Sequence, residues 1–455
     1  MRIELSIPLT LGEIAHACHG TLAGCDETVS HITTDSRECE AGDLFFALRG
    51  EQHDGNAYAE DVIARGASVI SSRISNARIV CDDTNSALLT LASYYKKRLP
   101  ILKHTVAITG SVGKSTTKEI TAGLLANKYK THKTKNNHNN SIGMPMSILS
   151  APRDTEVLVL EMGMNHSGEI SALSKAAEPD VAVITNIGTA HIGNLGTREN
   201  IARAKLEICD SNPKHIIIPY DEPLLQGRGT LTFSADSHSA DVALIERAEN
   251  GQIYEYVSHL RSLPQSLVFK TDARHIAHCA AAALSVAACC GIDMCSTGEF
   301  SYYFDQNTWQ NIKQISRIAI IEDYYNASYE SFISGFEYSS SLKSYSKRSA
   351  LIGDILELGD STEEIHRRVG FSAASFGYSK IFAFGKFSEY VKSGAIEAGF
   401  CADNIFINSD LSAPQITAEQ IIGHADDGEL IYAKASRGTR LERVTDAIEM
   451  ISRRE

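Results

Sequence analysis

The sequence predicts an α/β protein of three domains, and this prediction rests on the chain length and on two separate series of apolar segments. The chain has 455 residues, and at about 150 residues per domain that length suggests three domains. Hydrophobic residues make up 43% of the chain and charged residues 22%, which is ordinary for a globular protein and sufficient for several cores. We expect domains at 1–83, 84–308 and 309–455.

The first domain, residues 1–83, is expected to be a small α/β unit. Strand-like stretches separated by turn residues occur at 31–36 (HITTDS), 43–50 (DLFFALRG) and 67–74 (ASVISSRI). A helical pattern over 87–99 (ALLTLASYYKKRL) precedes Pro100, and proline is expected just past the end of a helix. We therefore place this helix at the start of the second domain.

The central domain is expected to contain a parallel sheet. Four near-continuous apolar runs alternate with helical segments, at 104–110, 156–163, 180–187 and 215–220. Such runs suit strands that are buried on both faces of a parallel sheet and covered by helices. The weakly polar run 279–292 (CAAAALSVAACCGI) is shorter than the ~20 residues that a bilayer requires, so it predicts a buried helix.

The C-terminal domain is expected to be Rossmann-like. The polar, irregular segment 304–314 (FDQNTWQNIKQ) predicts a linker. Five further strand candidates separated by helices follow it, at 317–325, 349–356, 380–385, 404–409 and 429–436. Strands and helices that alternate in this way predict a second doubly wound unit.

The net charge and the placement of the cysteines indicate which classes of protein this sequence does not fit. The formal net charge of −13 argues against nucleic-acid binding, because contact with a phosphate backbone needs a basic surface. The N-terminal segment lacks the residue order of a signal peptide. The ten cysteines are scattered without a CxxC pair, which favours reduced thiols. We expect a cytoplasmic monomer without membrane insertion.

The segment 104–125 (HTVAITGSVGKSTTKEITAGLL) predicts a site for a nucleoside triphosphate. Gly110 and Gly113 let the backbone N–H groups converge on phosphate oxygens at the start of a helix. Lys114 can reach the outer phosphates and the Ser115 hydroxyl can ligate Mg²⁺. The strict GxxxxGK[ST] pattern fails at Ile108, but an ordinary strand-to-helix turn does not explain a lysine between Gly113 and Ser115. The expected ATP-binding residues of this loop are Thr109, Gly110, Ser111, Val112, Gly113, Lys114, Ser115 and Thr116.

Two residues are expected at the carboxyl edge of the central sheet, where ligands bind in open parallel sheets. Glu161 closes one strand and is a candidate Mg²⁺ ligand, although an exposed glutamate at a strand end would look the same. His191 follows the next strand, and a lone histidine is more often structural than a ligand. Lys205 lies at the border of a helical apolar stripe, where most lysines are solvated. A partly buried lysine has a lowered pKa, and its neutral amine can take up CO₂ to form a carbamate, a carboxylate-like ligand for a second metal ion.

Eight ordered segments of the chain together resemble the Mur ligases, the ATP-dependent amide-forming enzymes of peptidoglycan precursor synthesis. They are TTDSRECEAGDLFFALRGEQHDG (33–55), AITGSVGKSTTKE (107–119), NNHNNSIGMP (136–145), EMGMNHSGEI (161–170), DVAVITNIGTAHIGNLGTRENIARAKLEI (180–208), IEDYYNASYES (321–331), LIGDILELGDSTEEIH (351–366) and AKASRGTRLERV (433–444). The EMGMNHSGEI and GDILELG segments resemble the family members that add D-Ala-D-Ala to a UDP-N-acetylmuramoyl tripeptide. The resemblance therefore implies these two substrates, ATP, two Mg²⁺ ions and an acyl-phosphate intermediate.

The resemblance also implies roles for residues in all three domains. The N-terminal domain would hold the UDP-sugar, with the candidate residues Ser36, Arg37, Asp54 and Gly55, the last two in a turn that could also be a plain hairpin loop. Lys114, Glu161, His191 and Lys205 correspond to catalytic positions, with Ser115, Glu161, His191 and carbamylated Lys205 as metal ligands. Asn139 and Asn140 fall in the asparagine-rich loop of the family, for which an ordinary turn is the alternative. Asp323, Tyr325 and Asn326 would meet the nucleotide from the C-terminal domain, and Lys434, Ser436 and Arg437 match its last basic loop.

The sequence also departs from the family pattern, mainly around the nucleotide base and the amine acceptor. The departures are Ser328 and Tyr329 in DYYNASYE, Trp309-Gln310-Asn311 in place of an arginine, Cys279 in place of an asparagine, Ala435 in place of a glycine, and Pro219 in place of an asparagine. The class of reaction is therefore better supported than the identity of the amine. Three alternatives remain: a sibling ligase with another amino-acid nucleophile, a glutamate-adding enzyme acting on folate, and a nucleotide-binding paralogue that lost catalysis. The DSR and GEQHDG segments disfavour the folate alternative, because they resemble a UDP-sugar domain.

Overall fold

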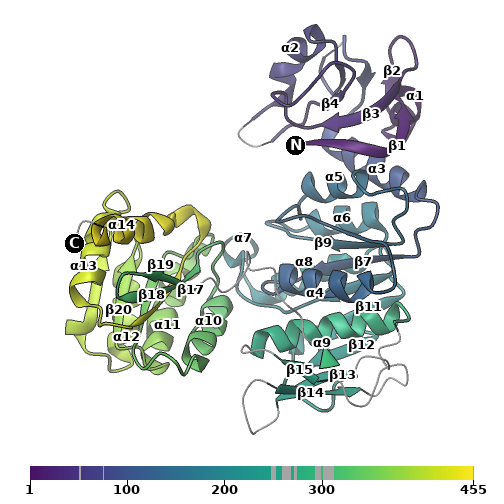
Figure 1. The fold of residues 1–455 in the computed structure, drawn as a ribbon. Helices are drawn as coiled ribbons and strands as arrows, with labels where there is room; N and C mark the ends of the chain where they lie inside the picture. The colour runs from purple at the N-terminus through teal and green to yellow at the C-terminus, as the bar shows by residue number, and fades with distance from the viewer. Residues whose placement is uncertain are drawn as a thin grey trace.

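Three β-sheets follow one another along the chain and organise the structure (Figure 1). The computed structural model describes residues 1–50, 53–74, 76–246, 253–258, 268–270, 274–292, 299–300 and 312–453. The sheets use strands from residues 2–80, 104–300 and 312–434. Each sheet is covered by helices, which confirms the predicted three-domain α/β class.

The N-terminal sheet has the strand order β1-β3-β4-β5-β6-β2. Its elements are β1 (Arg2–Thr10), α1 (Leu11–Ala17), β2 (Thr21–Leu22), β3 (Thr28–Thr33), β4 (Leu44–Phe46), η1 (Gly55–Tyr58), α2 (Ala59–Ala64), β5 (Ser68–Ser71) and β6 (Ile79–Val80). Strands β3 to β6 are parallel, and β1 pairs antiparallel with β3 at one end. Thr10 ends β1 and forms a capping box with Glu13, which satisfies free N–H groups at the start of α1.

The central sheet has the order β16-β15-β14-β13-β12-β11-β10-β7-β9-β8. Its strands are β7 (His104–Thr109), β8 (Thr131–Lys133), β9 (Val157–Glu161), β10 (Val181–Ile184), β11 (His215–Pro219), β12 (Leu231–Ser234), β13 (Val242–Glu246), β14 (Ile253–Ser258), β15 (Val268–Lys270) and β16 (Glu299–Phe300). The four predicted apolar runs form β7, β9, β10 and β11, which are parallel as expected. The antiparallel pairs β13–β14 and β14–β15 extend the sheet beyond the prediction.

Alternate residues of the central strands enter two different cores. Val106 and Ile108 pack with residues of α4 (Lys114–Ala126) and α9 (Arg274–Cys289) on one face. Ala107 and Leu158 face the other way, into a core that continues into the N-terminal domain. The helices on that second face are α3 (Thr84–Lys97), α5 (Gly143–Leu149) and α6 (Glu169–Ala177), while α7 (Ile192–Leu195) and α8 (Arg198–Leu206) follow β10.

The apolar run predicted as a buried helix forms most of α9, whose middle residues are buried against α4 and the sheet. Within the part of the chain that the structure describes, no helix combines the length and apolar character needed to cross a membrane.

Helix α3 begins at Thr84, with Asp83 as its N-cap. The domain boundary placed at this point stays a prediction, and the boundary between residues 308 and 309 lies outside the described residues.

The C-terminal sheet has the order β17-β18-β22-β19-β20-β21, and only the edge strand β17 is antiparallel. Its elements are β17 (Ile312–Ile315), β18 (Ile318–Asp323), α10 (Tyr329–Ser341), β19 (Arg348–Gly353), η4 (Gly359–Ser361), α11 (Thr362–Ser375), β20 (Lys380–Phe384), α12 (Ser388–Glu397), β21 (Ile405–Asn408), α13 (Pro414–His424), β22 (Leu430–Lys434) and α14 (Glu442–Ser452). The five predicted strands are present. The linker predicted for 304–314 is wrong at its end, because residues 312–315 pair with β18; residues 304–311 lie outside the described part of the chain.

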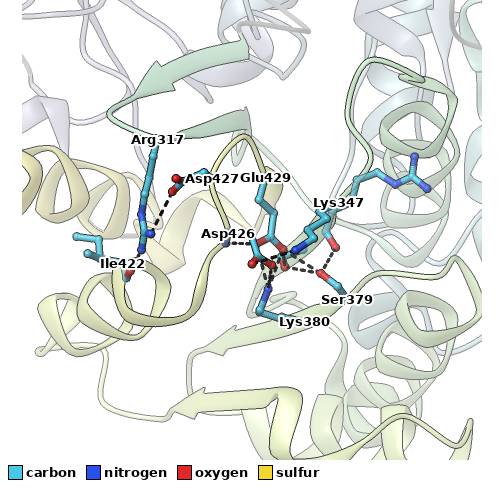
Figure 2. Close-up of polar contacts among 10 residues, drawn as sticks. Arg317, Lys347, Ser379, Lys380, Ile422, Asp426, Asp427 and Glu429 are labelled. Carbon is cyan, nitrogen blue, oxygen red and sulfur yellow. Dashed lines mark hydrogen bonds and ion pairs between the residues drawn. The ribbon is translucent and has the colours of Figure 1, made fainter.

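An ionic cluster centred on one buried carboxylate joins the amino ends of three strands of this sheet (Figure 2). The fully buried carboxylate of Glu429 accepts hydrogen bonds from the Ser379 hydroxyl at 2.9 Å, from the Lys380 ammonium at 3.1 Å and from the Ser349 hydroxyl. Lys380 also pairs with Asp426 at 2.9 Å. These residues lie at the edge of the sheet opposite to the carboxyl ends of its strands, so the cluster holds the fold together away from the candidate site.

Candidate active site

The predicted phosphate loop joins β7 to α4. Strand β7 lies between β10 and β9 in the central sheet. Gly110 has a φ angle of 153° and Gly113 one of 81°, which are conformations that favour glycine. A Cβ atom on Gly110 would lie 1.8 Å from the Oγ1 atom of Thr185, so the loop has no room for a side chain there. Helix α4 begins at Lys114, and its amino end presents free N–H groups beside the loop. Thr109 and Thr116, on either side of the loop, are both buried.

The segment that follows β10 holds the phosphate loop in place. The side-chain oxygen of Asn186 accepts hydrogen bonds from the backbone N–H groups of Ser111 and Val112, both at 2.9 Å. The Thr185 hydroxyl donates to the Val112 carbonyl at 2.6 Å, and the Ser111 hydroxyl accepts from the Gly188 N–H at 2.9 Å. Sequence reasoning missed Asn186, whose only signal is that it follows an apolar strand.

Lys114 turns back over its own loop. Its ammonium donates to the carbonyl oxygen of Gly110 at 2.7 Å and to that of Ser111 at 3.2 Å. Burial lowers the pKa of Lys114, and the negative charge of Glu161 opposes that shift. The lysine is therefore a partly buried cation at the loop that is expected to receive the phosphates.

Glu161 ends β9 and is buried beside the first turn of α4. Its Oε2 atom accepts a hydrogen bond from the Ser115 hydroxyl at 2.9 Å, and its Oε1 atom accepts one from the Asn139 amide at 2.9 Å. The two predicted metal ligands Ser115 and Glu161 are thus in direct contact. Asn140 has a different place, because its side-chain oxygen accepts from the N–H groups of Ile142 and Gly143 and so shapes the turn before α5.

Lys118 is a further buried cation at this site that sequence reasoning missed. It lies one helical turn after Lys114 and is only 1% exposed. Its ammonium lies 3.5 Å from the Glu161 carboxylate and 3.3 Å from that of Glu119, and it donates to the Asn136 carbonyl at 3.2 Å. Lys118 therefore connects α4 to the asparagine-rich loop and to the acid that ends β9.

His191 and Lys205 both lie close enough to Lys114 for its positive charge to act on them. His191 precedes α7 with a left-handed φ of 64°, and burial and the positive charge of Lys114 lower its pKa. Lys205 lies in α8 and is 2% exposed, not at a solvated border. Its pKa is well below the ordinary value because of burial and then because of Lys114. Both side chains therefore lie within electrostatic reach of the phosphate loop.

The donor set fits a divalent cation in part. Ser115 and Glu161 offer adjacent oxygen donors, which Mg²⁺ prefers. Within the described residues, no group of three histidine, cysteine, aspartate or glutamate side chains could hold a metal ion. A metal ion at this site would therefore need at least one donor of another kind.

Two of the predicted nucleotide residues of the C-terminal domain, Asp323 and Asn326, contact the buried Lys434. Asp323, at the end of β18, accepts hydrogen bonds from Lys434 at 2.8 Å and from Tyr432 at 2.6 Å. Lys434 also donates to the carbonyl oxygen of Asn326 at 2.9 Å. Tyr325 is 62% exposed. Surrounding protein partly desolvates its phenol and, together with the negative charge of Glu161, raises its pKa, which indicates that this side of the domain faces the central site.

Ser436 and Arg437, predicted to bind substrate, differ in exposure. Ser436 is buried, and its hydroxyl oxygen accepts a hydrogen bond from the Leu356 N–H at 3.0 Å. This contact joins the two loops that follow β22 and β19. The Arg437 side chain is 66% exposed and lies 3.6 Å from the carboxylate of Glu442, so of the two it is the side chain accessible to a ligand.

The four predicted UDP-sugar residues lie in the N-terminal domain. Arg37 is exposed and donates to both carboxylate oxygens of Asp35, at 2.9 and 2.6 Å. The backbone carbonyl of Ser36 accepts from Arg65 at 2.6 Å. Asp54 pairs with Arg73 at 3.2 Å, and a Cβ atom on Gly55 would lie 2.9 Å from the backbone of Leu48. None of the contacts found among the described residues joins these four to the central site. Glu51 and Gln52, in the same turn, lie outside the described part of the chain.

Two glutamates of the C-terminal domain contact the segment after β10, and sequence reasoning gave neither a role. Glu330, in α10, accepts from the Thr189 N–H at 2.9 Å and from the Thr189 hydroxyl at 3.1 Å. Glu357, just before η4, accepts from the Nδ1 atom of His191 at 2.8 Å. These contacts cross between domains over more than 140 residues of sequence, so no local pattern could reveal them.

Comparisons with known proteins agree with this geometry. The Mur ligase middle domain model matches residues 108–285, and the model of the Mur ligase family catalytic domain matches residues 28–95. The chain is 35% identical to UDP-N-acetylmuramoyl-tripeptide–D-alanyl-D-alanine ligase of Bacillus subtilis, a match that covers 97% of this chain and 99% of that protein. It is 28% identical to the Escherichia coli ligase of the same name, with the same coverage.

Solved structures show the same relationship. A crystal structure of MurF from Acinetobacter baumannii is 28% identical, has a TM-score of 0.86, and matches over 98% of this chain and all of that one. The structure of MurF ligase from Thermotoga maritima in complex with ADP is 28% identical, with a TM-score of 0.76, and covers 93% of this chain and 98% of that one. Since both sequence and fold match along nearly the whole chain, this protein belongs to the Mur ligase family of ATP-using ligases.

Proposed function

We propose that this protein joins D-Ala-D-Ala to the terminal carboxylate of a UDP-N-acetylmuramoyl tripeptide, with conversion of ATP to ADP and phosphate. The observation that carries the proposal is the assembly of Ser115, Glu161 and Asn139 directly beyond the Gly110–Lys114 loop. The relatives that match over nearly the full length have names that state this activity. A cytoplasmic site of action and a monomeric chain remain predictions.

The reaction has two steps. In the first, the peptide carboxylate attacks the γ-phosphorus of ATP, the bond to ADP breaks, and an acyl phosphate forms. In the second, the neutral amine of D-Ala-D-Ala attacks the acyl carbon, loses a proton, and releases inorganic phosphate. Both steps bring anions together, so positioned cations supply most of the stabilisation. Lys114 lies at the loop where it balances the charge of the β- and γ-phosphates.

Ser115 and Glu161 are the residues proposed to hold one Mg²⁺, and Glu161, His191 and a carbamate on Lys205 a second. Magnesium would supply positive charge beside the phosphoryl group that is transferred. The carbamate forms when the neutral Lys205 amine attacks CO₂ and loses a proton. The lowered pKa of Lys205 favours this step, because it increases the fraction of neutral amine.

The C-terminal domain is proposed to meet the nucleotide through Asp323, Tyr325 and Asn326, and to accept the dipeptide. Tyr325 and Arg437 are exposed side chains of this domain and are accessible to a ligand. Holding reactants in line can lower the activation barrier by roughly 7–11 kcal/mol at best. Closure of this domain is therefore expected in each turnover. The UDP-sugar is proposed to bind the N-terminal domain near Ser36, Arg37, Asp54 and Gly55.

The direct test is incubation of the full chain with ATP, a UDP-N-acetylmuramoyl tripeptide and D-Ala-D-Ala, with the product identified by mass spectrometry. The expected product is the pentapeptide with equimolar ADP. A panel of other amines, read out by phosphate release, tests the departures at Cys279 and Ser328. Faster turnover with a different amine would assign the chain to a sibling ligase, and ATP binding without turnover of any amine would contradict the ligase proposal.

A further inference from the structure

A loop of the C-terminal domain forms two hydrogen bonds with the segment that carries His191. Glu357 accepts a hydrogen bond from the His191 Nδ1 atom at 2.8 Å through its side chain, and one from the Gly193 N–H at 3.0 Å through its backbone carbonyl. A Cβ atom on Gly193 would lie only 2.5 Å from the backbone nitrogen of Gly359. Glu357 therefore holds both ends of this short segment.

The backbone on both sides of this contact is unusual. His191 and Glu357 each have a φ angle of 64°, in the left-handed region that residues other than glycine rarely adopt. Such strained conformations persist only where the surrounding structure fixes them. Leu358, the next residue, is buried in the hydrophobic core, so apolar packing holds the loop at this contact. The contact is therefore formed by a fixed loop rather than by a chance meeting of surface side chains.

The hydrogen bond determines which imidazole nitrogen carries the proton. A carboxylate can only accept a hydrogen bond, so the Nδ1 atom of His191 must donate to Glu357. The neutral ring then has its lone pair on Nε2. A metal ion binds a ring nitrogen that has a free lone pair, and a partner on the other nitrogen fixes the orientation of the ring.

We propose that Glu357 is a positioning residue: it holds His191 in the tautomer with the proton on Nδ1 and leaves Nε2 free to ligate the cation, so that the C-terminal domain prepares a ligand of the central domain. This inference rests on the proposed function for its metal, but its structural part concerns only two side chains of this chain. Glu330 acts at a neighbouring point, on Thr189, and does not contact the imidazole in the described structure.

The test is the tautomer of His191 in the metal-free full chain, measured by two-bond ¹⁵N–¹H NMR at pH 8 and assigned with His191→Gln. In the wild type we expect the Nδ1–H form to exceed the Nε2–H form by roughly tenfold or more, as a hydrogen bond to a charged acceptor supports. Glu357→Ala should reduce this ratio about tenfold, and Glu357→Gln, which keeps an oxygen acceptor, should restore part of it. An unchanged tautomer in Glu357→Ala overturns the proposal.

Two control variants distinguish a direct effect of Glu357 on the His191 tautomer from a general weakening of the contact between the two domains. Glu363→Ala removes an exposed carboxylate of the same domain, on α11, and should leave the ratio unchanged. Glu330→Ala removes the other carboxylate between the domains and should also leave it unchanged. A shift in Glu330→Ala as large as that in Glu357→Ala would overturn the proposal, because docking alone would then explain the effect.

A second measurement links the tautomer to metal use. The Mn²⁺ concentration that half-saturates turnover at saturating ATP should rise roughly tenfold or more in Glu357→Ala, as is typical when the partner of a metal-ligating histidine is removed. An unchanged Mn²⁺ dependence overturns the metal part of the proposal. If the wild type makes no amide product, the proposed function fails while the NMR result still decides the role of Glu357.

Discussion

The Ser115 hydroxyl donates a hydrogen bond to the Oε2 atom of Glu161 at 2.9 Å, across 46 residues of sequence. This contact places the first turn of α4 against the end of β9. Because Lys118 approaches the same carboxylate at 3.5 Å from the next turn, two side chains of α4 fix the position of the acid that ends β9. Pre-organised groups of this kind need little rearrangement when charge develops in a reaction.

Replacement of Lys114 tests the phosphate loop. Lys114→Ala should reduce ADP release by at least roughly 10²–10³-fold, because it removes a positioned cation next to the transferred charge. The measurement is ADP formation with all three substrates present. Lys97→Ala removes an exposed lysine on α3 and should leave the rate unchanged. A Lys114→Ala rate close to that of the control would show that the loop does not serve the reaction.

Replacement of Lys205 tests the carbamate. Lys205→Ala should lose most activity and regain part of it with acetate or propionate, since a small carboxylate can occupy the place of the carbamate. Sodium chloride at the same ionic strength is the control and should not restore activity. Wild-type protein equilibrated with ¹³C-bicarbonate should show a carbamate carbon signal that Lys205→Ala lacks. Near-normal activity of Lys205→Ala without added carboxylate would contradict the role of Lys205.

Much of the fold could be predicted because its central strands are buried on both faces. The runs that form β9, β10 and β11 are mostly apolar, and β7 has an apolar centre, Val106–Ile108, between polar ends. Such apolar runs can be recognised as strands without knowledge of their partners. The first three residues of the edge strand β17 fell in the predicted linker 304–314, because that segment is polar and irregular. The strand gains its order from pairing with β18. The antiparallel extension β13–β15 depends in the same way on long-range pairing.

The residues of the candidate site also differ in whether a local sequence pattern could reveal them. The phosphate loop is a local motif, so its residues could be named from spacing alone, and the place of Glu161 follows from the edge where parallel strands end. Asn186, Glu330 and Glu357 act through contacts between distant segments. Lys118 had a local signal, since it lies four residues after Lys114 on the same helical face, but a lysine at that spacing is usually solvated.

Replacement of Glu429 tests the ionic cluster of Figure 2. Glu429→Gln should reduce the stability of the C-terminal domain by about 3 kcal/mol, because it removes a buried charge from a paired cluster and leaves the Lys380 ammonium less compensated. Urea unfolding followed by circular dichroism measures the change. Asp427→Asn alters an exposed ion pair with Arg317 and should change stability by less than about 0.5 kcal/mol. Equal effects of the two variants would show that burial of Glu429 is unimportant.

The pH dependence of stability tests His275, in the first turn of α9. Burial, and then the positive charges of Lys434 and His278, lower its pKa from 6.5 to about 4. Between pH 6.5 and about pH 4 the unfolded chain binds a proton that the folded protein does not. His275 therefore leaves the free energy of unfolding unaffected above pH 6.5 and lowers it as the pH is reduced towards 4. His275→Gln cannot gain this charge, and its melting temperature should fall less than that of the wild type between pH 7 and pH 4.5. His166→Gln, at an exposed position, is the control and should follow the wild type. If His275→Gln also follows it, the imidazole of His275 takes up its proton equally in the folded and unfolded states.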